Sequence, residues 1–195
     1  MSREIVYFHS LSSPWAYLSG PRFHDIVRKH DLKVLLRPTT ILEENGGIPL
    51  RTRPSARQEY HELELDRWRK YLDMPLVLRP AHYPANPEYS ARMVIAADIL
   101  GWDALRLSHA LLRALWSEER DILDTQTRVE VAMVEGMDGA RLAEMQDTPD
   151  IMALWEKSHA EASAAGVFGT PTYVLNGERF WGQDRLEFLD RRLSE

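Results

Sequence analysis

Ser13 is the side chain in this sequence that is best placed to do chemistry. It precedes Pro14, and a Ser-Pro pair is typical of the N-cap and first turn of a helix, here expected to run to about His30. A helix N-terminus presents unpaired N–H groups and a partial positive charge, which stabilise anions, thiolates included. Ser13 can therefore donate a hydrogen bond to a bound thiolate. Plain helix capping is the simpler explanation of a lone Ser-Pro pair, and Ser12 competes for either role.

A second candidate lies near the other end of the chain, at Thr170 and Pro171. A turn of small residues precedes the pair, and the apolar strand predicted at Thr172–Leu175 follows it. A proline in this place can form a cis peptide bond, and it cannot donate to a sheet ladder. Thr170 can then offer its backbone N–H and C=O to an extended ligand, as a sheet edge does. The alternative is a proline that opens the strand and contacts no ligand.

Trp181, Gly182, Gln183 and Asp184 form a third candidate group, directly after a predicted hairpin. Its turn is Asn176-Gly177, the strongest short hairpin signal, and its return strand ends at Trp181. Asp184 is expected to cap a helix that runs to the C-terminus. The same carboxylate can bind the ammonium of an amino-acid-like group, with Gln183 contacting that group's carboxylate. Spacing alone favours the cap.

Two further polar side chains lie in segments predicted to be loops. Arg51 belongs to the polar segment Asn45–Arg57, and Tyr83 to the segment Met74–Pro87, which contains four prolines. Arg51 can bind a carboxylate and Tyr83 can face a substrate. A solvated polar segment is the simpler explanation for an arginine at position 51. The histidines and acids show no ligand spacing, so we predict no metal site.

The composition restricts the classes of function. The chain has 195 residues, 44% hydrophobic and 28% charged, which is typical of a soluble globular protein. A net charge of −6 and the lack of a basic run argue against nucleic acid as a partner. No apolar stretch is long enough to span a membrane, and the start lacks a signal-peptide core, so we expect a cytoplasmic protein. Without cysteine, any thiol chemistry must borrow its sulfur from a ligand.

The two ends of the chain predict an α/β fold with a thioredoxin-like sheet. Apolar runs at Ile5–Phe8 and Leu32–Arg37 read as strands on either side of the helix that starts after Ser13. The end of the chain adds two strands and a helix. In such a sheet the start of the first helix and the Thr170-Pro171 turn lie side by side, so the fold brings two weak signals together.

Between these ends the sequence predicts a large helical insertion. Residues 1–37 and 166–195 are expected to form the thioredoxin-like domain, and residues 38–165 the all-helical insertion domain. The predicted helices of the insertion are Ala56–Leu72, Tyr89–Leu100, Trp102–Ser117, Asp124–Glu135, Gly139–Met145 and Thr148–Ala165.

Both ends also resemble a known family. The segment Phe8–Leu18, with Ser13-Pro14-Trp15-Ala16-Tyr17-Leu18, is similar to the N-terminal active-site segment of 2-hydroxychromene-2-carboxylate isomerases. Gly166–Thr172 and Phe180–Leu186 resemble the C-terminal signature of that family, which is fairly specific to its glutathione-using members. The isomerases are relatives of kappa-class glutathione transferases, within the DsbA-like branch of the thioredoxin fold.

The resemblance implies glutathione as cofactor. Its cysteinyl part would pair with the backbone of Thr170 beside a cis Pro171, and its sulfur would lie near Ser13. Its γ-glutamyl end would meet residues 181–184, that is Trp181, Gly182, Gln183 and Asp184. Arg51 and Tyr83 are the candidates for contacts with an aromatic carboxylate substrate. Relatives are commonly dimers, which favours a homodimer.

The implied reaction belongs to the breakdown of naphthalene-type aromatics. It interconverts 2-hydroxychromene-2-carboxylate and trans-o-hydroxybenzylidenepyruvate, and Ser13 would keep the glutathione sulfur anionic while a thiolate adds to the conjugated carbon and leaves again. One alternative is a kappa-like glutathione transferase that releases the conjugate as product. The other is a thioredoxin-fold binding protein without enzymatic activity.

Overall fold

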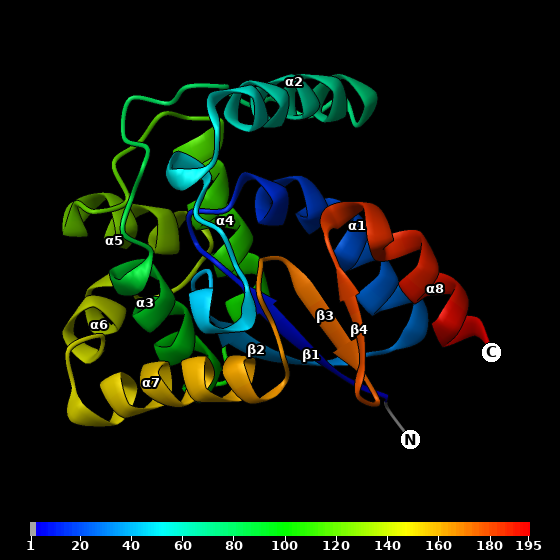
Figure 1. Ribbon diagram of the computed structural model, residues 1–195. Helices are drawn as coiled ribbons and strands as arrows, with labels where there is room; N and C mark the ends of the chain where they lie inside the picture. The colour runs from blue at the N-terminus through cyan, green and yellow to red at the C-terminus, as the bar shows by residue number, and fades with distance from the viewer. Residues whose placement is uncertain (1–2) are drawn as a thin grey trace.

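A four-stranded mixed sheet forms the centre of the computed structural model, which describes residues 3–195 (Figure 1). Its strands are β1 (Glu4–His9), β2 (Lys33–Pro38), β3 (Thr172–Leu175) and β4 (Glu178–Trp181), in the order β2-β1-β3-β4. β2 runs parallel to β1, whereas β3 is antiparallel to β1 and β4 to β3. The predicted β-α-β and β-β-α halves are therefore confirmed. Residues 1–2 of the predicted first segment lie outside the described residues.

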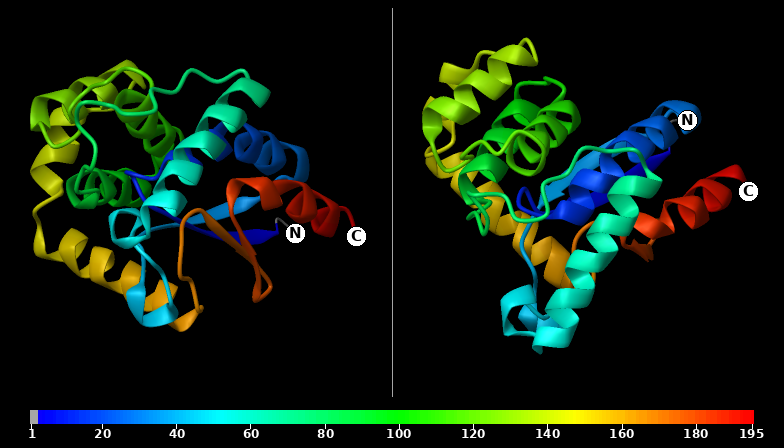
Figure 2. Two further views of the ribbon diagram at one scale, coloured as in Figure 1. Left: turned by 45° about the horizontal axis from the view of Figure 1, so that its top comes forward. Right: turned by 90° about the horizontal axis from the view of Figure 1, so that it is seen from above.

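Helices surround the sheet, and most of them lie in the chain between β2 and β3. α1 (Pro14–His30) and α8 (Leu186–Ser194) pack beside one another, while α3 and α7 pack against β2. Seen from above, α3 to α7 gather on one side of the molecule, and α1 and α8 lie on the other (Figure 2). The helices between β2 and β3 are α2 (Ser55–Tyr71), α3 (Glu88–Ile99), α4 (Ala104–Trp116), α5 (Thr125–Val134), α6 (Gly139–Met145) and α7 (Pro149–Ala164).

Local turn and cap chemistry explains why the elements begin and end where they do. Asn176 and Gly177 have φ angles of 51° and 85°, as the two central residues of a tight hairpin turn require. Ser13 is the N-cap of α1, and its hydroxyl accepts a hydrogen bond from the Ala16 N–H at 3.2 Å. Asp103 caps α4 in the same way, accepting a hydrogen bond from the Arg106 N–H. These signals are local, which is why they can be read from the sequence.

A stack of aromatic rings joins the sheet to α1. The Tyr7 ring lies parallel to the rings of His9 and Tyr173, with centroid separations of 4.3 and 5.0 Å, and Phe23 of α1 packs against both tyrosines. His9 is fully buried: its Nδ1 lies 3.4 Å from the Tyr7 carbonyl and its Nε2 2.7 Å from the Ser108 hydroxyl on α4. This stack links the strand before Ser13 to the helix after it and to β3.

α2 forms as predicted, but much of its apolar side is uncovered. Tyr60, Leu63 and Tyr71 are exposed, while Leu65 is buried and Trp68 is partly buried. The reason is its position, because α2 lies across α1 and apart from α3 to α7, so that only one side of it is packed (Figures 1 and 2). The segment Asn45–Arg57 before it is partly ordered into short 3-10 turns, one of which is Leu50–Thr52.

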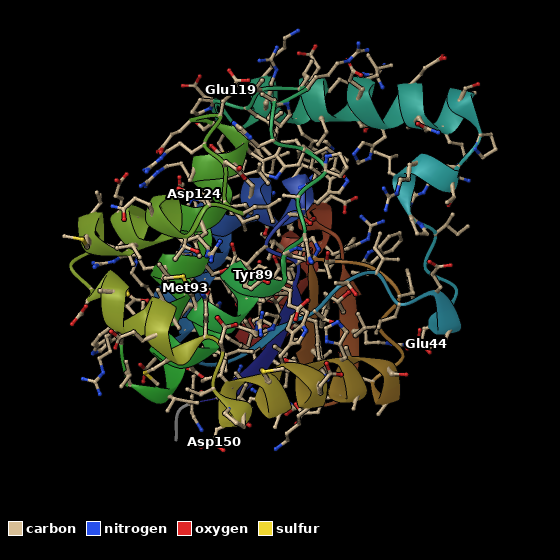
Figure 3. All side chains as sticks on the ribbon, turned by 90° about the vertical axis from the view of Figure 1, so that its left-hand side faces the viewer. Glu44, Tyr89, Met93, Glu119, Asp124 and Asp150 are labelled. Atoms are coloured by element: carbon tan, nitrogen blue, oxygen red, sulfur yellow. The ribbon has the colours of Figure 1, made fainter. Side chains whose placement is uncertain are left out.

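Two buried arginines hold the insertion together around Tyr89, which Figure 3 labels on α3. The guanidinium carbons of Arg92 and Arg128 lie 4.7 and 5.2 Å from the centroid of the Tyr89 ring, within the range of cation–π attraction. Arg128 also donates hydrogen bonds of 2.8 Å to the carbonyls of Ile122 and Leu123. The loop before α5 is thereby fixed against α3.

The predicted cap at Asp184 is wrong. α8 begins at Leu186, after a 3-10 turn over Gln183–Arg185, and no side chain caps either of these elements. Gly182 has a φ of 107° and starts this turn, in which its carbonyl accepts the Arg185 N–H at 3.2 Å. The backbone therefore satisfies the start of the turn, and the Asp184 carboxylate lies on the surface, paired with Arg185 at 2.6 Å.

Gly20 is required inside α1 because His109 of α4 lies against it. A Cβ at Gly20 would overlap the His109 imidazole, whose ring also stacks on Tyr17. Gly20→Ala should therefore destabilise the protein by up to about 2 kcal/mol, because an overpacking cost of about 1–3 kcal/mol is partly offset by the roughly 1 kcal/mol gained from helix propensity. Urea unfolding measures this change. The double variant Gly20→Ala/His109→Ala should recover part of the loss from overpacking, whereas wild-type stability in Gly20→Ala would show that the contact is loose.

Candidate active site

The structure brings Ser13 and Thr170 together although 157 residues separate them in the chain. The Ser13 hydroxyl donates a hydrogen bond to the Thr170 carbonyl at 3.2 Å while it accepts one from Ala16. Because Ser13 is the N-cap residue of α1, the partial positive charge of the helix N-terminus lies beside its hydroxyl. The predicted meeting of the helix start and the proline turn is therefore observed as a direct contact.

The turn around Pro171 is held by its neighbours. The Thr170-Pro171 peptide bond is cis, the Pro171 carbonyl accepts the Gly182 N–H at 2.9 Å, and the Thr172 hydroxyl donates to the Gly169 carbonyl at 2.7 Å. Within residues 3–195, the Thr170 N–H donates to no protein group. A free backbone N–H therefore lies close to a hydroxyl and a helix N-terminus, a combination of donors that suits an anionic or extended ligand.

Trp181 borders the same turn from β4. Its side chain is 50% exposed and its indole packs edge-on against Phe168, with ring centroids 4.6 Å apart. A Cβ at Gly169 would lie 2.7 Å from the Trp181 Nε1, so the turn must carry a glycine at this position to accept the indole. The arrangement places a half-exposed aromatic side chain beside Gly169, close to the Pro171 turn.

Gln183 is placed differently from its neighbours in residues 181–184. Its side chain is 2% exposed, and Arg22 of α1 donates to both its backbone carbonyl and its Oε1. The Gln183 amide oxygen is therefore already engaged within the protein, while Asp184 is exposed. The sequence carries no signal of this contact, because Arg22 and Gln183 are 161 positions apart in the chain.

Arg51 and Tyr83 approach one another from separate loops. Burial raises the pKa of Tyr83, and the nearby positive charge of Arg51 opposes that rise. The Tyr83 ring packs on the buried Trp116, with centroids 4.8 Å apart. Arg51 is exposed on the 3-10 turn Leu50–Thr52. The charge of Arg51 therefore acts on the Tyr83 hydroxyl, although the two residues belong to different loops.

His61 of α2 lies over the start of α1. Its ring meets the Trp15 ring edge-on, with centroids 5.3 Å apart. Burial lowers the pKa of His61 to about 4, and the nearby positive charge of Arg53 adds to this effect. The imidazole is therefore neutral at pH 7. No local pattern in the sequence marks this position, because the ring that His61 meets lies on another helix.

The described part of the chain holds neither a metal-binding cluster nor a membrane-spanning helix. Within residues 3–195 no group of three or more His, Cys, Asp or Glu side chains is arranged to hold a metal ion. Among the same residues, no helix combines the length and the apolar character that crossing a membrane requires.

Comparison with known proteins identifies the family. The model of the DSBA-like thioredoxin domain matches residues 4–194. The chain belongs to this family. The predicted fold class, a DsbA-like thioredoxin sheet with a helical insertion, is thereby confirmed.

The chain is similar to enzymes of two kinds. It is 27% identical to the 2-hydroxychromene-2-carboxylate isomerase of Sphingobium xenophagum, over the full length of both chains. It is 24% identical to glutathione S-transferase kappa 1 of Rattus norvegicus, over 99% of this chain and 92% of the rat protein. The family resemblance read from the two ends of the sequence therefore extends over the whole chain.

Solved structures match the fold over almost the same length. A 2-hydroxychromene-2-carboxylate isomerase superposes with a TM-score of 0.77 at 22% identity, covering 98% of this chain and 94% of the other. The cytosolic disulfide reductase DsbM of Pseudomonas aeruginosa, solved with GSH, gives 0.72 at 20% identity and covers 98% and 100%. At these identities the matches establish the fold.

Proposed function

We propose that this protein is a glutathione-dependent isomerase that interconverts 2-hydroxychromene-2-carboxylate and trans-o-hydroxybenzylidenepyruvate. The contact between the Ser13 hydroxyl and the Thr170 backbone carries the proposal, because it creates an anion-stabilising site in a chain without cysteine. The full-length similarity to a named isomerase supplies the reaction. A coupled measurement of substrate disappearance and glutathione concentration tests it: substrate should isomerise only when glutathione is present, and glutathione should not be consumed.

The residues around the Pro171 turn fit glutathione. The Thr170 N–H lacks a protein partner within residues 3–195, so it can pair with the cysteinyl backbone of the tripeptide. The exposed Asp184 can bind the γ-glutamyl ammonium, and the half-exposed Trp181 side chain and the backbone of Gly182 and Gln183 would border that group. A relative in the kappa class of glutathione transferases and the DsbM structure solved with GSH support the same cofactor.

Ser13 then acts on the sulfur as a hydrogen-bond donor. When bound, glutathione supplies a thiolate nucleophile whose reversible addition to a conjugated carbon permits rotation about the former double bond. Ser13 can turn its hydroxyl hydrogen from the Thr170 carbonyl toward the sulfur, because a hydroxyl rotates freely about its C–O bond. The α1 N-terminus adds its partial positive charge, so the thiol pKa falls. Arg51 and Tyr83 would receive the carboxylate and the ring of the aromatic substrate.

A kappa-like glutathione transferase is the second candidate function, and the similarity to the rat enzyme supports it. The two functions differ in the fate of glutathione. Product analysis with an aromatic electrophile separates them, since a transferase consumes one glutathione for each product and an isomerase regenerates it. A protein that binds no glutathione at all would instead be a thioredoxin-fold binding protein.

Asp184→Ala should weaken glutathione binding by about 10-fold, since a charge-assisted hydrogen bond contributes about 1.5–3 kcal/mol and Asp184 is exposed to solvent. Calorimetric titration of glutathione into both proteins measures the change. Glu187→Ala, an exposed carboxylate one turn further along, is the matched control and should bind as the wild type does. Equal affinity of Asp184→Ala and wild type would remove Asp184 from the site.

A further inference from the structure

Arg22 connects three segments that border the proposed glutathione site. It lies on α1, two turns after the Ser13 cap, and its Nη2 donates to the Gln183 carbonyl at 3.0 Å and to the Gln183 Oε1. Its guanidinium carbon also lies 5.8 Å from the centroid of the Trp68 ring on α2. One side chain thus links α1, α2 and the turn that carries Asp184.

The environment of Arg22 is costly for a cation. Burial lowers the pKa of its guanidinium, while Tyr173, Tyr71 and Asp184 act in the opposite direction. Its Nε is buried and lacks a hydrogen-bond partner within residues 3–195. A buried donor without a partner costs free energy, and incompletely satisfied groups of this kind call for a reason beyond packing. The contact of Arg22 with the turn that contains Gln183 supplies such a reason.

We propose that Arg22 is a positioning residue for glutathione, which holds residues 182–184 so that Asp184 faces the γ-glutamyl group. The inference rests on the proposed function. Gln183 is the link in this arrangement, because both of its oxygens accept from Arg22 and its side chain is buried. The backbone of the turn and the Asp184 carboxylate are then left to meet the ligand.

A guanidinium is suited to this role. Both hydrogen bonds to Gln183 come from one nitrogen, Nη2, whose two hydrogens lie in the guanidinium plane, and the same flat group lies beside the Trp68 ring. A lysine ammonium has no such plane to place beside the indole. Because α2 belongs to the insertion, the same contact couples the position of α2 to the turn. Loss of the guanidinium should therefore loosen the γ-glutamyl subsite and leave Ser13 in place.

Arg22→Lys and Arg22→Met test the proposal in steady-state kinetics and glutathione titration. Both variants should raise the Kd and the KM for glutathione by about 10-fold, which is the effect expected from losing one or two hydrogen bonds to a charged group. The kcat at saturating glutathione should stay within about 2-fold of wild type. Arg28→Met is the matched control, because Arg28 lies on the same helix and is exposed. It should change neither constant.

The outcomes separate this inference from the proposed function. A wild-type protein that binds no glutathione contradicts the proposed function itself. A wild-type protein that binds glutathione, with Arg22→Met binding equally well, overturns only the role of Arg22, and so does full rescue by lysine. A merely structural role would lower the unfolding midpoint without a selective rise in KM. If Arg22→Met does not fold, Gln183→Leu removes the Oε1 acceptor instead and should raise KM in the same way.

Discussion

Replacing Ser13 with alanine should lower kcat for isomerisation by about 100-fold while the protein remains folded. A kcat loss of this size is what removal of a single hydrogen-bond donor to a developing anion causes in other enzymes. The Ser13 hydroxyl donates to the Thr170 carbonyl at the start of α1, so its loss leaves the proposed thiolate with the helix N-terminus alone. The same change also removes the N-cap of α1, which should cost about 1 kcal/mol of stability. Steady-state kinetics and urea unfolding measure the two effects separately.

Two control variants separate capping from catalysis. Ser13→Gly keeps most of the capping free energy, to within a few tenths of a kcal/mol, yet lacks the hydroxyl, so it should be as inactive as Ser13→Ala and more stable. Ser12→Ala removes a neighbouring hydroxyl that contacts Ser10 at 3.2 Å, and it should keep wild-type turnover. Near-normal kcat in both Ser13 variants would show that this hydroxyl takes no part in the reaction.

Acid should destabilise the protein by about 3 kcal/mol through His9 alone. Complete burial in the aromatic stack lowers the pKa of His9 from 6.5 to about 4, and each pH unit between folded and unfolded values corresponds to about 1.4 kcal/mol. Between pH 6.5 and 4 the unfolded chain therefore binds a proton that the folded protein does not. The stabilisation is fully present above pH 6.5 and is lost progressively as the pH falls toward 4.

The contribution of His9 is measured as a difference between two pH profiles. The free energy of unfolding in urea should fall steeply for the wild type between pH 6.5 and 4. His9→Asn should be less stable at pH 7, because it loses ring stacking and the contact with Ser108, but its profile should be flatter over the same range. Parallel profiles for the two proteins would show that His9 does not titrate in this window.

The parts of the fold that could be predicted depend on short-range signals. Asn176 and Gly177 define the hairpin because these two adjacent residues adopt left-handed conformations. Ser13 caps its helix by accepting a hydrogen bond from a backbone N–H only three residues away. The approach of Ser13 to Thr170 is a longer-range result, yet it follows once the β-α-β and β-β-α halves are assigned to one sheet. The candidate site could therefore be placed before any contact was known.

The remaining features depend on pairs that are distant in the sequence and have no local signal. Arg22 and Gln183 are one such pair, and their contact makes Gln183 a buried link where the sequence suggested a direct ligand contact. Asp184 looked like a helix cap, because a carboxylate near a helix start usually is one, but the 3-10 turn after Gly182 uses backbone groups instead. The direct contact of the Gln183 amide with glutathione stays a prediction.

The pKa of the glutathione thiol bound to the wild-type protein tests the central claim most directly. Thiolate absorbance in the ultraviolet, followed against pH at saturating glutathione, reports this value for wild type and Ser13→Gly. We expect the bound thiol to ionise at least one pH unit below free glutathione in the wild type, a difference of about 1.4 kcal/mol, and to move back toward the free value in Ser13→Gly. An identical pKa for bound and free thiol would contradict the account.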